Sequence, residues 1–97
     1  MADLQYVKLS PQEVESRLGA LDGWRVSEGM LKKDFEFKTY KDGLVFASAV
    51  GYLADAMDHH PDLIIGYKKV SVAVNTHSVG GISPYDFELA RRISALG

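Results

Sequence analysis

The stretch that decides the fold runs from residue 62 to residue 75 and reads Asp62-Leu63-Ile64-Ile65-Gly66-Tyr67-Lys68-Lys69-Val70-Ser71-Val72-Ala73-Val74-Asn75. Its apolar residues alternate on both sides of a short polar segment, which is typical of two strands joined by a tight turn. With Lys68-Lys69 as a two-residue turn, the apolar pairs fall on one face: Tyr67 with Val70, Ile65 with Val72, and Leu63 with Val74. The stretch therefore predicts an antiparallel hairpin with one face in the core.

All three histidines of the chain flank this hairpin. Asp58-His59-His60-Pro61 precedes it, and Thr76-His77 follows it. The predicted register places His60 opposite His77, with Cβ atoms about 4.5–5.5 Å apart. Because imidazoles titrate near neutral pH, such a meeting of rings suits general acid–base catalysis.

A capped helix and a first hairpin are predicted before this region. Ser10-Pro11-Gln12-Glu13 has the serine, proline and glutamate of a capping box at a helix start. The helix's apolar stripe comprises Val14, Leu18 and Leu21, and Gly23 is expected to end it. A strand at 24–26, a turn at 27–29 and an alternating strand up to residue 37 follow.

The longest helical pattern covers residues 43–57 and follows the capped start at Thr39. We expect it to run into Asp58-His59-His60 and to stop at Pro61. Its predicted apolar face comprises Val45, Ala49, Tyr52, Leu53 and Ala56, with Phe46, Val50 and Met57 beside it. Gly51 costs a helix about 1 kcal/mol relative to alanine, so we expect close packing there.

The last helix opens at Ser83-Pro84-Tyr85-Asp86, and its apolar side comprises Phe87, Leu89, Ala90, Ile93 and Leu96. The order α-β-β-α-β-β-α predicts an α+β fold. We expect one four-stranded antiparallel sheet with helices packed on one face, in a single domain spanning residues 1–97. The sheet's uncovered face and edges favour self-association, as a homodimer or homotetramer.

Composition narrows the function classes. The 97 residues are 46% apolar and 25% charged, with a net charge of −2, which is ordinary for a globular protein and unsuited to a nucleic-acid surface. The chain has no cysteine, so disulfide and thiolate chemistry are excluded. The start Met1-Ala2-Asp3-Leu4-Gln5-Tyr6 lacks the pattern of a signal peptide, and no apolar run suits a membrane span. We expect a soluble, cytoplasmic protein.

The histidines admit three interpretations. They could be ordinary polar residues at strand ends, or ligands of a small metal-binding module. Regular ligand spacing and cysteine are missing, and adjacent residues of a strand point apart, so we expect no bound metal. Acid–base catalysis is the third interpretation, with Asp58, Asp62 or Asp86 fixing the tautomers. By spacing alone, Asp86 is first a helix cap.

The arrangement of motifs resembles that of the pterin-4a-carbinolamine dehydratases. It comprises Asp55-x-x-x-His59-His60-Pro61, Tyr67, Thr76-His77, Gly81 and Asp86, and the resemblance extends over nearly the whole chain. Membership implies dehydration of 4a-hydroxytetrahydrobiopterin to quinonoid dihydropterin, in tetrahydrobiopterin recycling after aromatic amino acid hydroxylation. It implies no cofactor. Two departures are Leu63, where members often carry tryptophan, and Asp55, which is shorter than the glutamate often found there.

The resemblance also implies the site residues. His59, His60 and His77 match the catalytic histidines, Asp86 the acid that orients an imidazole, and Asp55 the acid before the histidine pair. Substrate binding is implied for His59, His60, Pro61, Thr76, His77, Ser78 and Val79. We hypothesise that His59 and His77 flank the hydroxyl-bearing carbon. The alternative function is a non-catalytic dimerisation or binding scaffold, because some members are dimerisation partners of a transcription factor.

Overall fold

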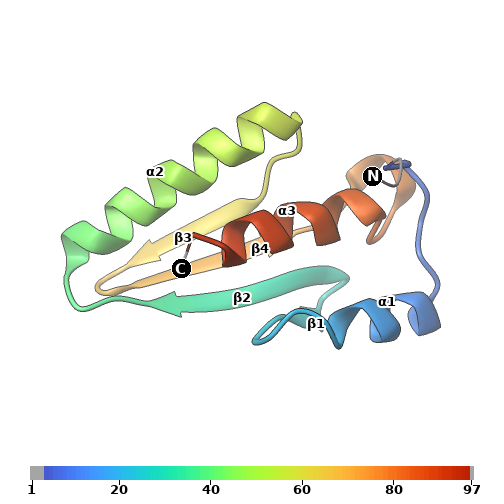
Figure 1. The fold of residues 1–97 in the computed structure, drawn as a ribbon, viewed down its shortest axis with the longest axis horizontal. Helices are drawn as coiled ribbons and strands as arrows, with labels where there is room; N and C mark the ends of the chain where they lie inside the picture. The colour runs from blue at the N-terminus through green and yellow to red at the C-terminus, as the bar shows by residue number, and fades with distance from the viewer. Residues whose placement is uncertain (1–3, 97) are drawn as a thin grey trace.

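The computed structural model describes residues 4–96; residues 1–3, which begin the stretch examined for a signal peptide, and residue 97 lie outside it. The elements follow the predicted order (Figure 1). They are α1 (Pro11–Leu18), β1 (Arg25–Ser27), β2 (Met30–Glu36), α2 (Tyr40–Met57), β3 (Asp62–Gly66), β4 (Lys69–Val74), the 3-10 turn η1 (His77–Val79) and α3 (Pro84–Ser94).

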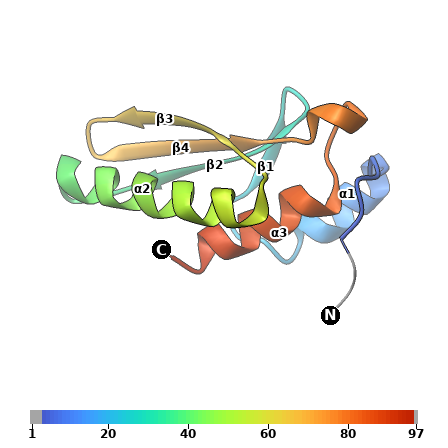
Figure 2. The ribbon, with the colours of Figure 1, turned by 90° about the horizontal axis from the view of Figure 1, so that it is seen from above.

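The strands form one antiparallel sheet in the order β1-β2-β4-β3. Seen edge-on, the sheet is one layer and the helices form the other (Figure 2). The predicted α+β fold is therefore confirmed. The core lies between the layers and includes Leu31 and Val72 from the sheet, Val50 from α2 and Ile93 from α3.

The second hairpin has a different register from the predicted one. Gly66 pairs with Lys69, so the loop is Tyr67-Lys68 rather than Lys68-Lys69. Ile65 pairs with Val70, a shift of two residues along the partner strand. A shift of two leaves each side chain on its face, so the apolar pattern fits both registers. Lys68 adopts a left-handed conformation with a φ of 62°, and its carbonyl accepts a hydrogen bond from Phe37 N–H.

Two helix ends also differ from the prediction. α1 ends at Leu18 rather than at Gly23, because the next N–H groups, of Ala20 and Leu21, bond three residues back and tighten the chain. α2 ends at Met57, and Pro61 does not stop it. Asp58 is left-handed, with a φ of 50°, and the N–H of His59 bonds the carbonyl of Ala54. This is a Schellman ending with aspartate in the place of glycine.

The outer side of α2 carries exposed apolar residues, contrary to the predicted apolar face. The helix buries Phe46, Val50 and Ala54, whereas Val45 is 65% exposed and Tyr52 is 78% exposed. Among the described residues, nothing lies within 4 Å of where a Cβ on Gly51 would stand. The close packing expected at Gly51 is therefore not found within the chain. Leu96, predicted on the apolar side of the last helix, is also exposed.

Acid stability is expected to depend on Glu88 in α3. Its hydrogen bond from Arg91, followed by that from Arg92, lowers the pKa of Glu88 from 4.5 to about 2. A lowered pKa in the folded state stabilises the fold above the unfolded pKa, and this contribution is lost as pH falls from 4.5 towards 2. In urea titrations, Glu88→Gln should therefore lose less free energy of unfolding over this range than the wild type. The exposed control Glu36→Gln should lose as much as the wild type; equal losses in all three proteins would contradict this assignment.

Candidate active site

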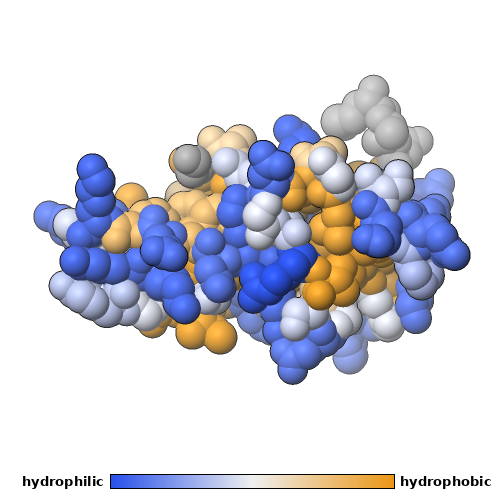
Figure 3. Space-filling model, turned by 90° about the horizontal axis from the view of Figure 1, so that it is seen from below, coloured by the Kyte–Doolittle hydropathy of each residue, from blue (hydrophilic) through white to orange (hydrophobic). Residues whose placement is uncertain are grey.

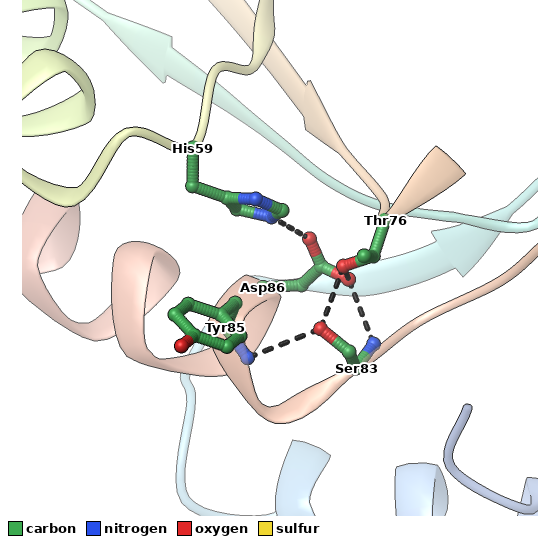
Figure 4. Close-up of polar contacts among 5 residues, drawn as sticks. All are labelled: His59, Thr76, Ser83, Tyr85 and Asp86. Atoms are coloured by element: carbon green, nitrogen blue, oxygen red, sulfur yellow. Dashed lines mark hydrogen bonds and ion pairs between the residues drawn. The ribbon is translucent and has the colours of Figure 1, made fainter. Parts of the chain in front are cut away.

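His59 is held in the interior by Asp86 (Figure 4). It follows the left-handed turn at Asp58, which directs the chain away from α2, and its side chain reaches the first turn of α3. Its Nε2 lies 2.5 Å from Oδ1 of Asp86. His59 is only 7% exposed and Asp86 is fully buried. A buried carboxylate paired in this way fixes the position of the imidazole.

The second oxygen of Asp86 is held by two donors. Oδ2 accepts hydrogen bonds from Thr76 Oγ1 at 2.9 Å and from the backbone N–H of Ser83 at 2.8 Å. Ser83 Oγ lies 2.6 Å from Thr76 Oγ1 (Figure 4). The Ser83 N–H contact also belongs to the capping box of α3. Asp86 therefore both begins α3 and orients His59, which are the two roles considered for it from the sequence.

The network assigns the tautomer of His59. An ionised carboxylate only accepts hydrogen bonds, so Nε2 of His59 is the donor and carries a proton. In the neutral imidazole the lone pair then lies on Nδ1. Within residues 4–96 no side-chain nitrogen or oxygen is fully buried without a hydrogen-bond partner. Nδ1 has no hydrogen bond to residues 4–96, so it is not among the fully buried atoms and keeps some exposure to solvent.

His60 points the other way and lies at the surface. Its Nε2 lies 2.8 Å from Oδ1 of Asp55, and both side chains are exposed. Asp55, the acid before the histidine pair, lies in the last turn of α2 and pairs with His60 rather than with His59. His60 and Asp55 line a surface hollow of about 450 Å³ together with Ser48, Gly51, Tyr52, Ala54, Pro61 and Leu63. Such an exposed pair orients the ring and adds little stability.

His77 begins η1, and its side chain is exposed. The predicted pairing of His60 with His77 is wrong, because Asp62, the first residue of β3, lies opposite Ala73, and extending this register by two residues gives Asn75 rather than His77 as the position opposite His60. Within residues 4–96 no hydrogen bond joins any two of the three imidazoles. Thr76, expected to bind substrate, is buried and contacts Asp86, so it places His77 one residue from the buried network. Ser78 is exposed and Val79 half-buried on the same turn.

A second surface hollow lies away from the histidines and is more apolar than the first. A groove of about 460 Å³ lies beside α1 and is lined mainly by apolar residues, among them Leu9, Val14, Leu18 and Ile82. The face shown in Figure 3 is largely hydrophilic, and its hydrophobic residues form separate areas, one of them right of the centre. No histidine lines this groove, and its charged side chains are Lys8 and Glu15. In residues 4–96 no group of three or more His, Cys, Asp or Glu side chains could hold a metal ion, and no helix is long and apolar enough to cross a membrane.

Two tyrosines beside His59 were not predicted as part of the site. Tyr85 lies next to Asp86, and its ring centroid is 5.8 Å from that of His59. Tyr6 stacks on Tyr85 with a centroid distance of 4.0 Å. The sequence gives one signal for Tyr85, its place in the cap of α3, and none for Tyr6.

Comparisons with known sequences and structures show what the chain is similar to. The sequence profile of the family described as pterin 4 alpha carbinolamine dehydratase matches residues 7–96. A protein of Sulfolobus acidocaldarius, named provisionally as a pterin-4-alpha-carbinolamine dehydratase, is 41% identical over 90 residues, which cover 93% of this chain and 99% of the relative.

Two solved structures share the fold. A protein from Brucella melitensis, described as a transcriptional coactivator/pterin dehydratase, superposes with a TM-score of 0.88 at 31% identity and covers 92% of this chain and 97% of its own. A pterin dehydratase-like protein described as a RuBisCO assembly factor in the alpha-carboxysome has a TM-score of 0.64 at 26% identity, covering 76% and 88%. On the profile match and the Sulfolobus relative, the chain belongs to the pterin-4a-carbinolamine dehydratase family.

Proposed function

We propose that the protein is a 4a-hydroxytetrahydrobiopterin dehydratase, which converts the pterin 4a-carbinolamine to quinonoid dihydropterin in tetrahydrobiopterin recycling after aromatic amino acid hydroxylation. The observation that carries this proposal is the hydrogen-bonded chain from His59 to Asp86, Thr76 and Ser83. Such a chain presents one imidazole nitrogen in a fixed tautomer to a ligand. Family membership supports the substrate class.

The reaction requires two proton transfers. The bond between C4a and the hydroxyl oxygen breaks, a proton joins the leaving oxygen to give water, and a ring nitrogen loses a proton as its double bond to C4a forms. Nδ1 of His59 is suited to accept the ring proton, because Asp86 fixes the proton of Nε2. In this proposal the exposed His77 donates to the leaving oxygen, and His60, oriented by Asp55, positions the ring. Pro61, Ser78 and Val79 complete the substrate contacts.

A direct assay tests the proposal. The 4a-carbinolamine is generated in a stopped-flow instrument, and formation of the quinonoid product is followed with and without the protein. Acceleration proportional to protein concentration, with saturation in substrate, is expected. A rate equal to the spontaneous one at micromolar protein would reject the dehydratase proposal.

A non-catalytic scaffold is the alternative function. The similar RuBisCO assembly factor shows that the fold occurs in a protein described by an assembly role. A scaffold does not require a buried aspartate that fixes a histidine tautomer. Burying a carboxylate and an imidazole also carries a desolvation penalty, which lowers the free energy of unfolding. The buried His59–Asp86 pair therefore favours catalysis in this chain.

We further propose that the protein is a homo-oligomer in which α2 packs against α2 of a second copy. The outer stripe of α2 comprises Lys41, Leu44, Val45, Ser48, Gly51, Tyr52 and Asp55. In an antiparallel pair centred on Ser48, Lys41 of each helix would face Asp55 of the other, and Val45 would face the space beside Gly51. Opposite charges at the ends and a small residue opposite a larger one make this stripe complementary to itself. In this arrangement the exposed helical Gly51, for which residues 4–96 offer no packing reason, makes room for Val45 of the second copy.

Association is expected to depend on Val45. Sedimentation velocity of the wild type should give a mass that is a multiple of the 10.7 kDa chain. Val45→Glu should shift the protein to single chains, because two charges would be buried in the helix pair. The matched control Val26→Glu changes an exposed valine of β1 and should leave the mass unchanged. A single-chain mass for the wild type, or an unchanged mass for Val45→Glu, would reject this interface.

A further inference from the structure

Tyr85 covers the ring of His59 on the side of α3. The two ring planes are inclined by 43° at a centroid distance of 5.8 Å, and Figure 4 shows the Tyr85 ring beside the imidazole. Tyr85 and Asp86 are consecutive residues at the start of α3. Asp86 thus holds one nitrogen of His59, while the ring of Tyr85 lies beside the imidazole.

The position of Tyr85 is set by the cap of α3. Its backbone N–H donates to Ser83 Oγ at 3.2 Å, and Ser83 Oγ also contacts Thr76 in the buried network. The local structure that places Asp86 therefore also places Tyr85. This makes the aromatic ring part of the same rigid unit as the carboxylate.

The segment of residues 4–9 lies over the outer side of Tyr85. Tyr6 stacks on Tyr85 with planes inclined by only 12°, and the N–H of Leu9 donates to the carbonyl of Ile82 at 2.8 Å. These two contacts anchor the segment at Tyr6 and Leu9 against the start of α3 and the residue before its cap. Desolvation, followed by the neighbouring Tyr85 and the charge of Asp58, raises the pKa of Tyr6. The geometric contact of Tyr6 with the site is its stacking on Tyr85, the residue before Asp86.

We propose that Tyr85 is a positioning residue that acts through His59, and that Tyr6 with the 4–9 segment holds Tyr85 in place. Tyr85 fixes the plane of the imidazole and excludes water from the hydrogen bond between Nε2 and Asp86. The N-terminal segment is then a strap on the active site rather than a loose extension. The kinetic consequence rests on the proposed dehydratase activity, but the structural one does not.

The first test is exchange of the Nε2-bound proton of His59 with water, measured by NMR on nitrogen-15-labelled protein. Tyr85→Ala should speed this exchange on the order of tenfold or more, because local opening is needed for exchange of a covered hydrogen bond. Tyr85→Phe should exchange like the wild type, since the ring is kept, and Tyr6→Ala should lie between them. Tyr67→Ala, which removes an exposed tyrosine remote from His59, is the matched control and should not change the rate.

The second test is kinetic and separates the two proposals. In the stopped-flow assay Tyr85→Ala should lower kcat on the order of tenfold to a hundredfold, with a smaller change in KM, since a misplaced imidazole costs rate more than binding. Faster proton exchange in Tyr85→Ala together with an inactive wild type would reject the dehydratase function while leaving the positioning role in place. Unchanged exchange in Tyr85→Ala overturns the positioning role whatever the activity. If Tyr85→Ala does not fold, Tyr85→Leu and Tyr6→Ala decide in the same way.

Discussion

Replacing Asp86 with asparagine is expected to lower kcat for dehydration by about 10²–10⁴-fold, the range of a general acid–base contribution. The asparagine can turn its NH₂ group towards Nε2 of His59 and donate to it, which moves the imidazole proton to Nδ1. The nitrogen offered to the substrate would then carry a proton instead of a lone pair. If the amide oxygen faces His59 instead, the NH₂ group opposes the N–H of Ser83, which is also a donor. Either orientation disrupts the network.

Stability should fall as well in this variant. A buried donor without an acceptor costs about 1–3 kcal/mol, so the free energy of unfolding in urea should drop by about that amount. Asp55→Asn is the matched control, since it makes the same change in the exposed His60–Asp55 pair. It should alter kcat by only a few-fold, on the order of the small free energy of an exposed pair, and leave stability near that of the wild type. Equal losses of kcat in the two variants would contradict the special role of Asp86.

Removing both His59 and His77 is expected to abolish catalysis. Each imidazole can contribute about 10²–10⁴-fold, so the His59→Ala/His77→Ala double variant should approach the spontaneous rate. If the two rings act as base and acid in one step, the second substitution should cost less than the first. Stopped-flow traces of the two single variants and the double variant measure this directly.

Thermal melting followed by circular dichroism separates a loss of catalysis from a loss of folding in these variants. His77 is exposed, so His77→Ala should melt like the wild type, whereas His59→Ala leaves Asp86 Oδ1 unpaired and costs about 1–3 kcal/mol. His60→Ala, which alters a positioning contact, should raise KM more than it lowers kcat. Near-normal turnover of a folded double variant would contradict the acid–base mechanism.

The fold followed from the sequence where local signals agreed with each other. Both Ser-Pro helix starts form capping boxes, at Ser10 and at Ser83, because the motif satisfies backbone donors regardless of tertiary context. The register of the second hairpin was wrong by two residues, because alternation fixes the face of a side chain but not its partner. The end of α2 was missed since aspartate rarely takes the left-handed conformation that glycine usually supplies there.

The candidate site was harder to predict, because its contacts depend on a turn and on partners that local sequence patterns do not specify. The two adjacent histidines do point apart, with His59 buried and His60 exposed, as expected for consecutive residues in extended chain. Which aspartate each one meets depends on the turn at Asp58, which local patterns do not specify. Asp55, for which the sequence specifies no particular histidine, pairs with His60 for that reason. Tyr6 gave no signal at all, because its partner Tyr85 lies far along the chain and stacking has no sequence pattern.

The double duty of Asp86 has a consequence for directed evolution of this chain. One carboxylate both nucleates the first turn of α3 and sets the tautomer of His59. Substitutions of residues 83 and 86 in a search for thermostable variants would therefore change both the free energy of unfolding and kcat. Stabilising substitutions are better sought at exposed positions outside both the cap of α3 and the outer stripe of α2. We expect few substitutions of Asp86 to be tolerated, because the replacement would have to both cap α3 and orient His59.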